Sequence, residues 1–385
     1  MTGRKVLIGC GIAMLVLLVA IAGGGLYIFH QIAPSLNGRL KAPSAFAHPG
    51  IVTGSGFLSK SEFIAEPVLG NVTDIVPGKL DPTPGVEMGI AGTQGSVFID
   101  NAGHVKCSVS FGAMSMYTNV SIVSVRGKDT CEFMNRGSWA SKPALLDHTG
   151  KVLWEYTSKW GADDMTAGDL KGDGSLEFAV GLNGSGGVVL LNSTGRTLWS
   201  KPDGNVWHVE IADVKGDGRL EIVHSNAGGK ITVRDASGNV ISKSAVGAGV
   251  YFSDFSLCTW PTKKDVERLL VSSKGAIWLL DFGGGMVKKF DAPDCPDLSH
   301  ARGALVTLRS GHPEYLAVLV DVKNSRQSLF YVYNSEGKLV YHEILPEPSA
   351  SIAAIAADKS GAESILVGGE GHVTRYSTSA AAPRK

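Results

Sequence analysis

Short apolar segments alternate along the chain with turns that are rich in glycine and polar residues. Residues 188–191 (Val-Val-Leu-Leu) and 198–199 (Leu-Trp) form one such pair, and residues 277–280 and 329–333 repeat the pattern. β-Branched and aromatic residues are frequent in these segments, and the segments do not show the period of an amphipathic helix. The pattern therefore predicts an all-β fold that is built from short strands.

A turn marker recurs between these segments. An Asp or Asn followed three residues later by Gly occurs at Asp100/Gly103, Asp147/Gly150, Asn192/Gly195, Asp235/Gly238, Asp281/Gly284 and Asn334/Gly337. The Asx side chain can close its own backbone into a turn, and glycine takes the left-handed position. Each pair is therefore expected to be a hairpin turn.

A repeated glutamate gives the register of a longer unit. It stands in or just before an apolar run at Glu87, Glu132, Glu177, Glu221, Glu267, Glu314 and Glu363, with successive gaps of 45, 45, 44, 46, 47 and 49 residues. This period matches a β-propeller blade, which has four strands in ~40–50 residues. We therefore predict a seven-bladed β-propeller, since six or eight blades fit the count less well.

The seventh unit lacks its second turn and its outermost strand. Residues 57–64 precede the first unit, have the pattern of a strand and belong to no repeat. Pairing this stretch into the seventh blade would remove an exposed sheet edge and close the ring. We expect residues near 55–66 to be the closing strand. Residues 251–264 exceed the usual turn length and are expected to form a loop.

The N-terminal region predicts a membrane anchor. Residues 6–29 are 24 residues without a charge, and a helix of that length extends roughly 36 Å, against ~30 Å for the hydrocarbon core of a bilayer. Arg4 and Lys5 precede the run, so the positive-inside bias places the N-terminus in the cytoplasm. A signal peptide that is cleaved after residues 20–22 (Ala-Ile-Ala) is the alternative.

These observations give a single-pass membrane protein with a periplasmic or extracellular propeller. The expected organisation is a cytoplasmic N-terminus (1–5), a transmembrane signal anchor (6–29), a stalk (30–45), the seven-bladed propeller (46–380) and a disordered tail (381–385). The fold class is thus an all-β propeller preceded by a single transmembrane helix.

Composition supports a globular chain without a preferred charged partner. Hydrophobic residues make up 44% and charged residues 19% of the 385 residues, and the 49 glycines fit many tight turns. Lys+Arg and Asp+Glu are equal at 36 each. Because no net charge results, nucleic acid is not expected as a partner.

Four cysteines outside the apolar run leave two alternatives open. Cys107, Cys131, Cys258 and Cys295 form no CxxC pair, which argues against a zinc site. Outside the cytoplasm, disulfides persist, and Cys107–Cys131 and Cys258–Cys295 enclose the shortest loops. Four buried thiols are the other possibility, because free cysteine is readily buried.

Two copies of one loop carry the sharpest motif. Residues 169–177 read Asp-Leu-Lys-Gly-Asp-Gly-Ser-Leu-Glu, and residues 213–221 read Asp-Val-Lys-Gly-Asp-Gly-Arg-Leu-Glu. With the apolar strand that follows, this motif resembles the FG-GAP/VCBS-type repeats of integrin-like propellers, and residues 190–199 resemble the quinoprotein-type propeller repeat. The resemblance implies a seven-bladed propeller for adhesion or ligand binding, with structural Ca²⁺ in this loop.

The candidate calcium ligands follow from this resemblance. They are Asp169, Asp173 and Glu177 in one loop and Asp213, Asp217 and Glu221 in the other. Ca²⁺ takes ~6–8 oxygen ligands, but the third position, which is Asp or Asn in the family, is Lys171 or Lys215 here. An ammonium cannot ligate a cation. Either lysine turns to solvent and leaves a weak site, or it takes the place of the ion.

No sequence motif indicates an enzyme. The chain has no G-x-S-x-G, H-E-x-x-H, P-loop or G-x-G-x-x-G motif, and its ten histidines have no metal-ligand spacing. The leading hypothesis is a non-enzymatic, membrane-tethered propeller that binds a protein or glycan in adhesion. The alternatives are an enzyme of quinoprotein or polysaccharide-lyase type with a site in the channel, or an assembly scaffold in an envelope complex. Clustered carboxylates, Arg and His at a channel mouth would favour the enzyme, whereas a broad apolar patch would favour binding.

Overall fold

The computed structural model describes most of the chain from residue 48 to residue 379. The described ranges are 48–111, 119–124, 130–137, 142–226, 229–245, 254–260, 263–273, 275–296, 299–322, 325–356 and 361–379. The expected anchor 6–29, the residues before it, the stalk 30–45 and the tail 381–385 lie outside them. No helix within the described ranges is long and apolar enough to cross a membrane.

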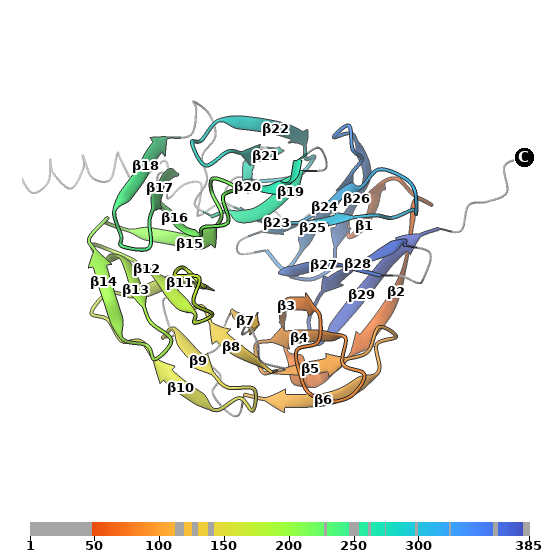
Figure 1. Cartoon of the computed structure of the whole chain (residues 1–385). Coiled ribbons are helices and arrows are strands. Elements are labelled where there is room, and N and C mark those ends of the chain that lie inside the picture. The colour runs from red at the N-terminus through yellow and green to blue at the C-terminus, as the bar shows by residue number, and fades with distance from the viewer. Residues whose placement is uncertain are drawn as a thin grey trace, which may run out of the picture. The chain divides into compact units, whose positions relative to one another are not determined.

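Seven antiparallel sheets surround a central axis, as the prediction of seven blades requires (Figure 1). Blade 1 is β3 (Val72–Pro77), β4 (Met88–Gly92), β5 (Gly95–Ile99) and β6 (Val105–Ser110). Blade 2 is β7 (Val120–Ser124), β8 (Cys131–Asn135), β9 (Ala144–Leu146) and β10 (Val152–Glu155). Blade 3 is β11 (Ala162–Gly168), β12 (Glu177–Leu182), β13 (Gly187–Leu191) and β14 (Thr197–Lys201). Blade 4 is β15 (Val206–Ala212), β16 (Glu221–Asn226), β17 (Lys230–Arg234) and β18 (Val240–Ala245).

The remaining three blades include the two ends of the ring. Blade 5 is β19 (Ser256–Trp260), β20 (Lys263–Ser273), β21 (Ala276–Leu280) and β22 (Met286–Asp291). Blade 6 is β23 (Ser299–Val306), β24 (Tyr315–Val322), β25 (Ser328–Tyr333) and β26 (Leu339–Leu345), with β1 (Gly50–Thr53) as a fifth strand. Blade 7 is β27 (Ser351–Ala356), β28 (Glu363–Gly368), β29 (His372–Thr378) and β2 (Leu58–Ala65). A short 3-10 helix, η1 (Pro67–Leu69), joins β2 to blade 1.

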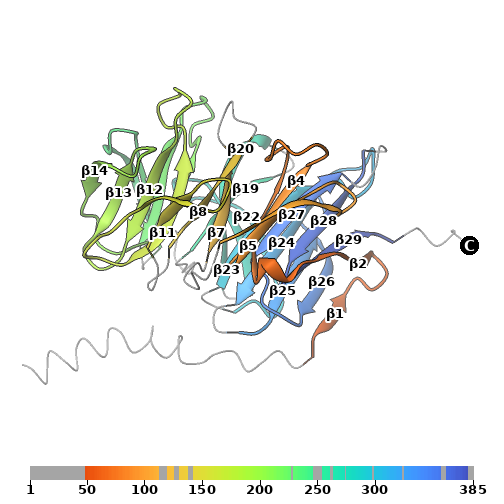
Figure 2. The ribbon, with the colours of Figure 1, turned by 90° about the horizontal axis from the view of Figure 1, so that it is seen from below.

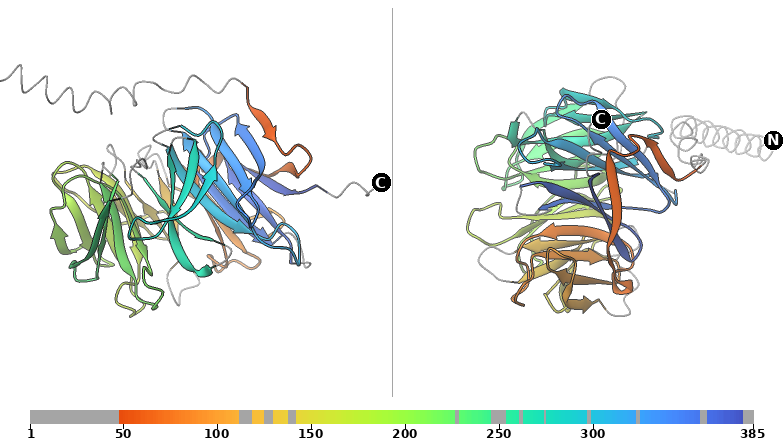
Figure 3. Two further views of the ribbon diagram at one scale, coloured as in Figure 1. Left: turned by 90° about the horizontal axis from the view of Figure 1, so that it is seen from above. Right: turned by 90° about the vertical axis from the view of Figure 1, so that its right-hand side faces the viewer.

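The predicted closing strand is confirmed. Strand β2 pairs antiparallel with β29 from Leu58 opposite Thr378 to Ala65 opposite His372. The right-hand view of Figure 3 shows this N-terminal strand beside the C-terminal strands. The pairing satisfies the backbone groups along one edge of β29, so the ring closes with a strand from each end of the described chain.

The repeated residues have the positions that the repeat requires. The six Asx–Gly pairs form the turns between the third and fourth strands of blades 1 to 6, and each of these glycines has a positive φ. Six of the seven glutamates lie at or near the start of the second strand of their blade, and Glu267 lies near the middle of β20. Glu177 and Glu221 are buried, whereas the other five are not.

Tryptophans on the outer strands of blades 2 and 3 attach each of these blades to a turn of the next blade. The Nε1 atom of Trp154 on β10 donates a hydrogen bond to the carbonyl of Ser193 (3.1 Å). The Nε1 atom of Trp199 on β14 donates one to the carbonyl of Ala236 (2.9 Å). The Trp154 ring also lies against Gly195, and the Trp199 ring lies against Gly238. A side chain at either glycine would clash with the ring, and both glycines also have a positive φ.

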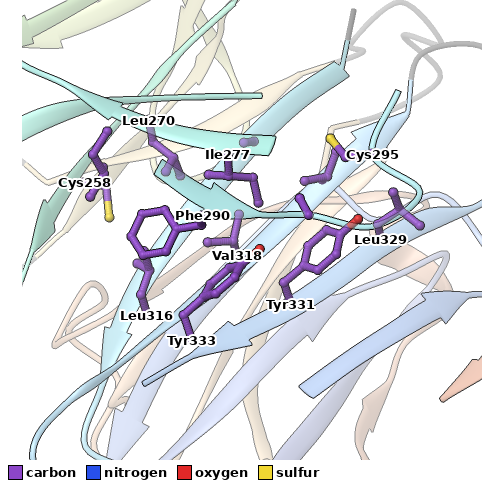
Figure 4. Close-up of a cluster of buried hydrophobic side chains, with 14 of the residues drawn as sticks. Cys258, Leu270, Ile277, Phe290, Cys295, Leu316, Val318, Leu329, Tyr331 and Tyr333 are labelled. Carbon is purple, nitrogen blue, oxygen red and sulfur yellow. The ribbon is translucent and has the colours of Figure 1, made fainter. Parts of the chain in front are cut away.

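The apolar core lies between neighbouring blades, whose sheets face one another in the edge-on view of Figure 2. Figure 4 shows the part between blades 5 and 6, where the rings of Phe290 and Tyr333 pack 4.8 Å apart. The hydroxyl of the buried Tyr333 donates to the carbonyl of Asp291 (2.9 Å). Aromatic area is thus buried without leaving the hydroxyl unpaired.

Two expectations from the sequence need correction here. The four cysteines are free thiols, so the bridges Cys107–Cys131 and Cys258–Cys295 are not formed in this structure. Cys258 and Cys295 instead pack in the core of blades 5 and 6. The stretch 251–264 is not a continuous loop, because it contains β19, and Trp260 is buried in the same core. The charged residues that follow Trp260 have the composition of a loop, although β19 pairs antiparallel with β20 there.

Candidate functional site

A cavity of about 270 Å³ lies at the centre of the propeller. Its walls come from the innermost strands of six blades, β3, β7, β15, β19, β23 and β27, together with Arg136, which follows β8. The lining is mixed. Its apolar residues are Leu257 and Ile352. Its polar residues are Arg136, Arg302, His208, His300, Asp74, Glu210, Thr73, Ser121, Ser256 and Ser351. Residues far apart in the sequence therefore meet in one channel.

A register shift near the start of three innermost strands accompanies the charged side chains. The pairing with the second strand shifts between Val72 and Asp74 in β3, and again between Ala162 and Asp164 in β11. The same shift precedes His208 in β15. A β-bulge changes the direction in which the following side chain points, which explains why polar groups enter an otherwise apolar strand.

Arg136 is the centre of the first part of the network. It donates two hydrogen bonds to Asp164, from Nε (2.8 Å) and from Nη2 (3.1 Å). Its Nη2 atom also donates to Glu210 (3.0 Å). The side chains of Arg136 and Asp164 are 14% and 5% exposed, so little water screens the pair. Such a bidentate, charge-assisted contact is among the stronger polar interactions in proteins.

His208 connects this group to the second part of the network. Its Nδ1 atom contacts Asp164 and lies 3.0 Å from Asp254. The other oxygen of Asp254 lies 2.8 Å from Nδ1 of His300. The Nε2 atom of His300 accepts a hydrogen bond from Nε of Arg302 (3.1 Å), which leaves Nδ1 as the ring nitrogen that faces Asp254.

The pKa shifts agree with this pairing. Burial alone would raise the pKa of Asp164, but Arg136 and His208 lower it to about 2. Burial alone would lower the pKa of His208, but Asp164 and Asp254 raise it to about 10. Burial raises the pKa of Asp74, which has no cation at ion-pair distance among the described residues. At neutral pH, His208 is therefore an imidazolium and cannot act as a general base.

Two of the carboxylates also have a structural task. Asp74 accepts the backbone N–H of Ile122 in the next blade (2.8 Å), and Asp164 accepts that of Val209 (3.1 Å). The innermost strand of a blade has backbone N–H and C=O groups at its channel edge that no further strand pairs with. These two contacts satisfy some of the N–H groups. The carboxylates thus fix neighbouring blades to each other.

The candidate calcium loops are held by internal contacts. Lys171 donates to Glu177 (2.6 Å), and Lys215 donates to Glu221 (2.7 Å). Asp169 accepts the backbone N–H groups of residues 173 and 174, and Asp213 accepts those of residues 216–218. Asp173 accepts from Ser175, and Asp217 accepts the N–H of Arg219. The lysines therefore contact the glutamates that were expected to bind Ca²⁺. Across the described ranges, no three His, Cys, Asp or Glu side chains are grouped so that they could hold a metal ion.

The sequence interpretation missed the channel cluster, although a signal was present. Asp74, Asp164, His208 and Asp254 each stand 13 residues before the repeated glutamate of their blade, Glu87, Glu177, Glu221 and Glu267. A comparison of the units at that offset would have shown a polar position within an apolar strand.

A second surface feature lies on the outside of the ring. The large hydrophobic residues that are exposed in the described ranges are Ile51, Val52, Val105, Leu153, Leu198, Val240, Ile241, Met286 and Val287. All of them lie on the outermost strand of blades 1 to 6. Lysines follow them on β6, β14, β18 and β22, and lysine on an outer strand is a usual protection of a sheet edge.

Comparison with known proteins identifies the architecture. No protein-family model and no curated protein matches the chain. BBS1N, in the crystal structure of BBS1N in complex with ARL6DN, is similar at 11% identity and a TM-score of 0.55, over 83% of this chain and 97% of that chain. The WD40 domain of Neurospora crassa Pan2 is similar at 10% identity and a TM-score of 0.51, over 85% and 96%. The chain is thus a seven-bladed β-propeller protein, whereas the FG-GAP/VCBS repeat type and the membrane anchor stay predictions.

Proposed function

We propose that this chain is a non-enzymatic propeller that binds a protein partner outside the cytoplasm and is tethered to the membrane by residues 6–29. The observation that carries the proposal is the exposed apolar side chains on the outer strands of six successive blades. Exposed apolar surface is a feature of interaction sites where it is large and contiguous. The similarity to BBS1N, which was solved in complex with ARL6DN, is compatible with this role.

The chemistry of the channel also supports binding over catalysis. Arg136, Asp164 and His208 are engaged with one another, and buried ion pairs of this kind hold a single arrangement. A rigid ring presents its loops and outer strands in a fixed geometry, which suits recognition.

Proximity labelling with the full-length chain in its native membrane tests the proposal. The variant Met286→Lys/Val287→Lys should lose the labelled partner, because both side chains lie exposed on β22 (63% and 42%). The control Lys288→Gln changes a neighbouring polar residue and should keep it. An unchanged set of labelled proteins in the Met286→Lys/Val287→Lys variant, at unchanged melting temperature, would exclude this surface.

An enzyme with its site in the channel is the second candidate. The clustered carboxylates, arginines and histidines are the feature that favours it. If the channel is catalytic, His208→Gln should abolish turnover of a substrate that the wild-type chain converts, and leave partner labelling unchanged. Hydrolysis or lyase assays on a polysaccharide panel, with the wild-type chain and this variant, distinguish the two candidates.

A further inference from the structure

Among the described residues that line the channel cavity, one cation and one carboxylate form no ion pair with each other or with another charged side chain. Arg302 donates to His300 from Nε, and its only other hydrogen bond within the described ranges is a long one, from Nη1 to the carbonyl of Thr73 (3.5 Å). A guanidinium has five N–H donors, so most of those in Arg302 are unused. Arg136 and His208, the other two cationic side chains of the cluster, each have a carboxylate within 3.0 Å.

The unpaired carboxylate is Asp74. One of its oxygens accepts the N–H of Ile122, and no cationic side chain of the described part of the protein lies within ion-pair distance. Asp74 and Arg302 line the same cavity but form no ion pair with each other. Two opposite charges that remain separated at a cavity are expensive to bury unless something else compensates them.

The two unpaired groups indicate what a compensating ligand would carry. Arg302 is a donor, which suits a carboxylate, while Asp74 is an acceptor, which suits an ammonium.

The rest of the lining limits the size and polarity of the ligand. The volume of about 270 Å³ lies below the ~300–1,000 Å³ that is typical of sites for drug-sized molecules. Leu257 and Ile352 give the cavity an apolar portion beside its charges. A small molecule that combines a carboxylate, an ammonium and a short apolar group matches these features.

We propose that the channel binds a free α-amino acid with a small apolar side chain. Its carboxylate accepts hydrogen bonds from Arg302, its ammonium pairs with Asp74, and its side chain contacts Leu257 and Ile352. This site is distinct from the outer strands, so it goes beyond the binding of a protein partner.

Isothermal titration of the purified full-length chain with L-alanine, L-valine and L-leucine tests the proposal. At least one of them should bind saturably, and its N-acetyl and amide derivatives should bind roughly 10- to 100-fold more weakly, because each derivative loses one charge-assisted contact. These derivatives need no substitution in the protein, so the test does not depend on the folding of a variant.

Two variants connect the binding to the assigned residues. Arg302→Gln and Asp74→Asn should each weaken binding by a similar factor, whereas the exposed Arg309→Gln should leave it unchanged. No saturable binding of any of the three amino acids would overturn the proposal. Equal binding of the capped derivatives, or unchanged binding by a folded Arg302→Gln variant, would overturn it as well.

Discussion

Replacement of Gly195 by alanine measures the contact between blades 2 and 3. Gly195 has φ = 77° in the turn between β13 and β14. An added Cβ would lie 2.8 Å from ring atoms of Trp154 in the preceding blade. This ring cannot move freely, because its Nε1 atom donates to Ser193 and its edge packs against Phe178, with ring centroids 5.0 Å apart.

Two costs add in the Gly195→Ala variant. A left-handed alanine costs roughly 1–2 kcal/mol, and overpacking against a fixed ring costs roughly 1–3 kcal/mol more. We therefore expect a loss of about 2–5 kcal/mol in the free energy of unfolding, measured by urea denaturation. Gly204→Ala is the matched control: its φ is 83° and its Cβ would meet no atom within 4 Å, so only the first cost applies.

A double-mutant cycle separates the two costs. In a Trp154→Ala background the ring is absent, so Gly195→Ala should cost about as much as Gly204→Ala. If Gly195→Ala is no more destabilising than Gly204→Ala in the wild-type chain, or costs the same with and without Trp154, the inferred contact between blades does not exist.

Three further predictions concern the charged groups. Arg136→Met should lower the free energy of unfolding by about 3–5 kcal/mol, because it removes the arginine that pairs with the buried Asp164 and with Glu210. Lys142→Met, which removes an exposed ion pair, should change the same quantity by less than about 1 kcal/mol. The pKa of His208 is raised from 6.5 to about 10 on folding, so its contribution to stability is complete below pH 6.5 and is lost as the pH rises through about 10. Urea denaturation across this range should show that the free energy of unfolding falls more steeply with pH for the wild type than for His208→Gln. Equal dependence on pH in the two proteins would contradict the raised pKa of His208. Calcium should not shift the melting temperature of the wild-type chain but should raise that of Lys171→Asn/Lys215→Asn, because the ammonium groups now contact Glu177 and Glu221; a chelator-sensitive melting temperature in the wild type would show that the loops bind the ion despite the lysines.

The sequence by itself determined the repeat and therefore the ring. The repeated glutamates, and Asx–Gly pairs such as Asn192/Gly195, are local signals. A turn needs a residue that tolerates positive φ, and a buried strand needs an apolar run, whatever surrounds them. The closing strand could be deduced because an incomplete blade has an open edge, and one unassigned strand remained to cover it.

The channel was decided only by the tertiary structure. Arg136, Asp164, His208, Asp254 and Arg302 come from five different blades and are up to 166 residues apart, from Arg136 to Arg302. Their proximity depends on the closure of the ring and on bulges that redirect single side chains, and no local pattern contains either. The same holds for the lysines of the two sharp loops, whose motif indicated calcium while their side chains turned to the glutamates. Local sequence fixes backbone conformation, but the partner of a charged side chain is set by which blades become neighbours.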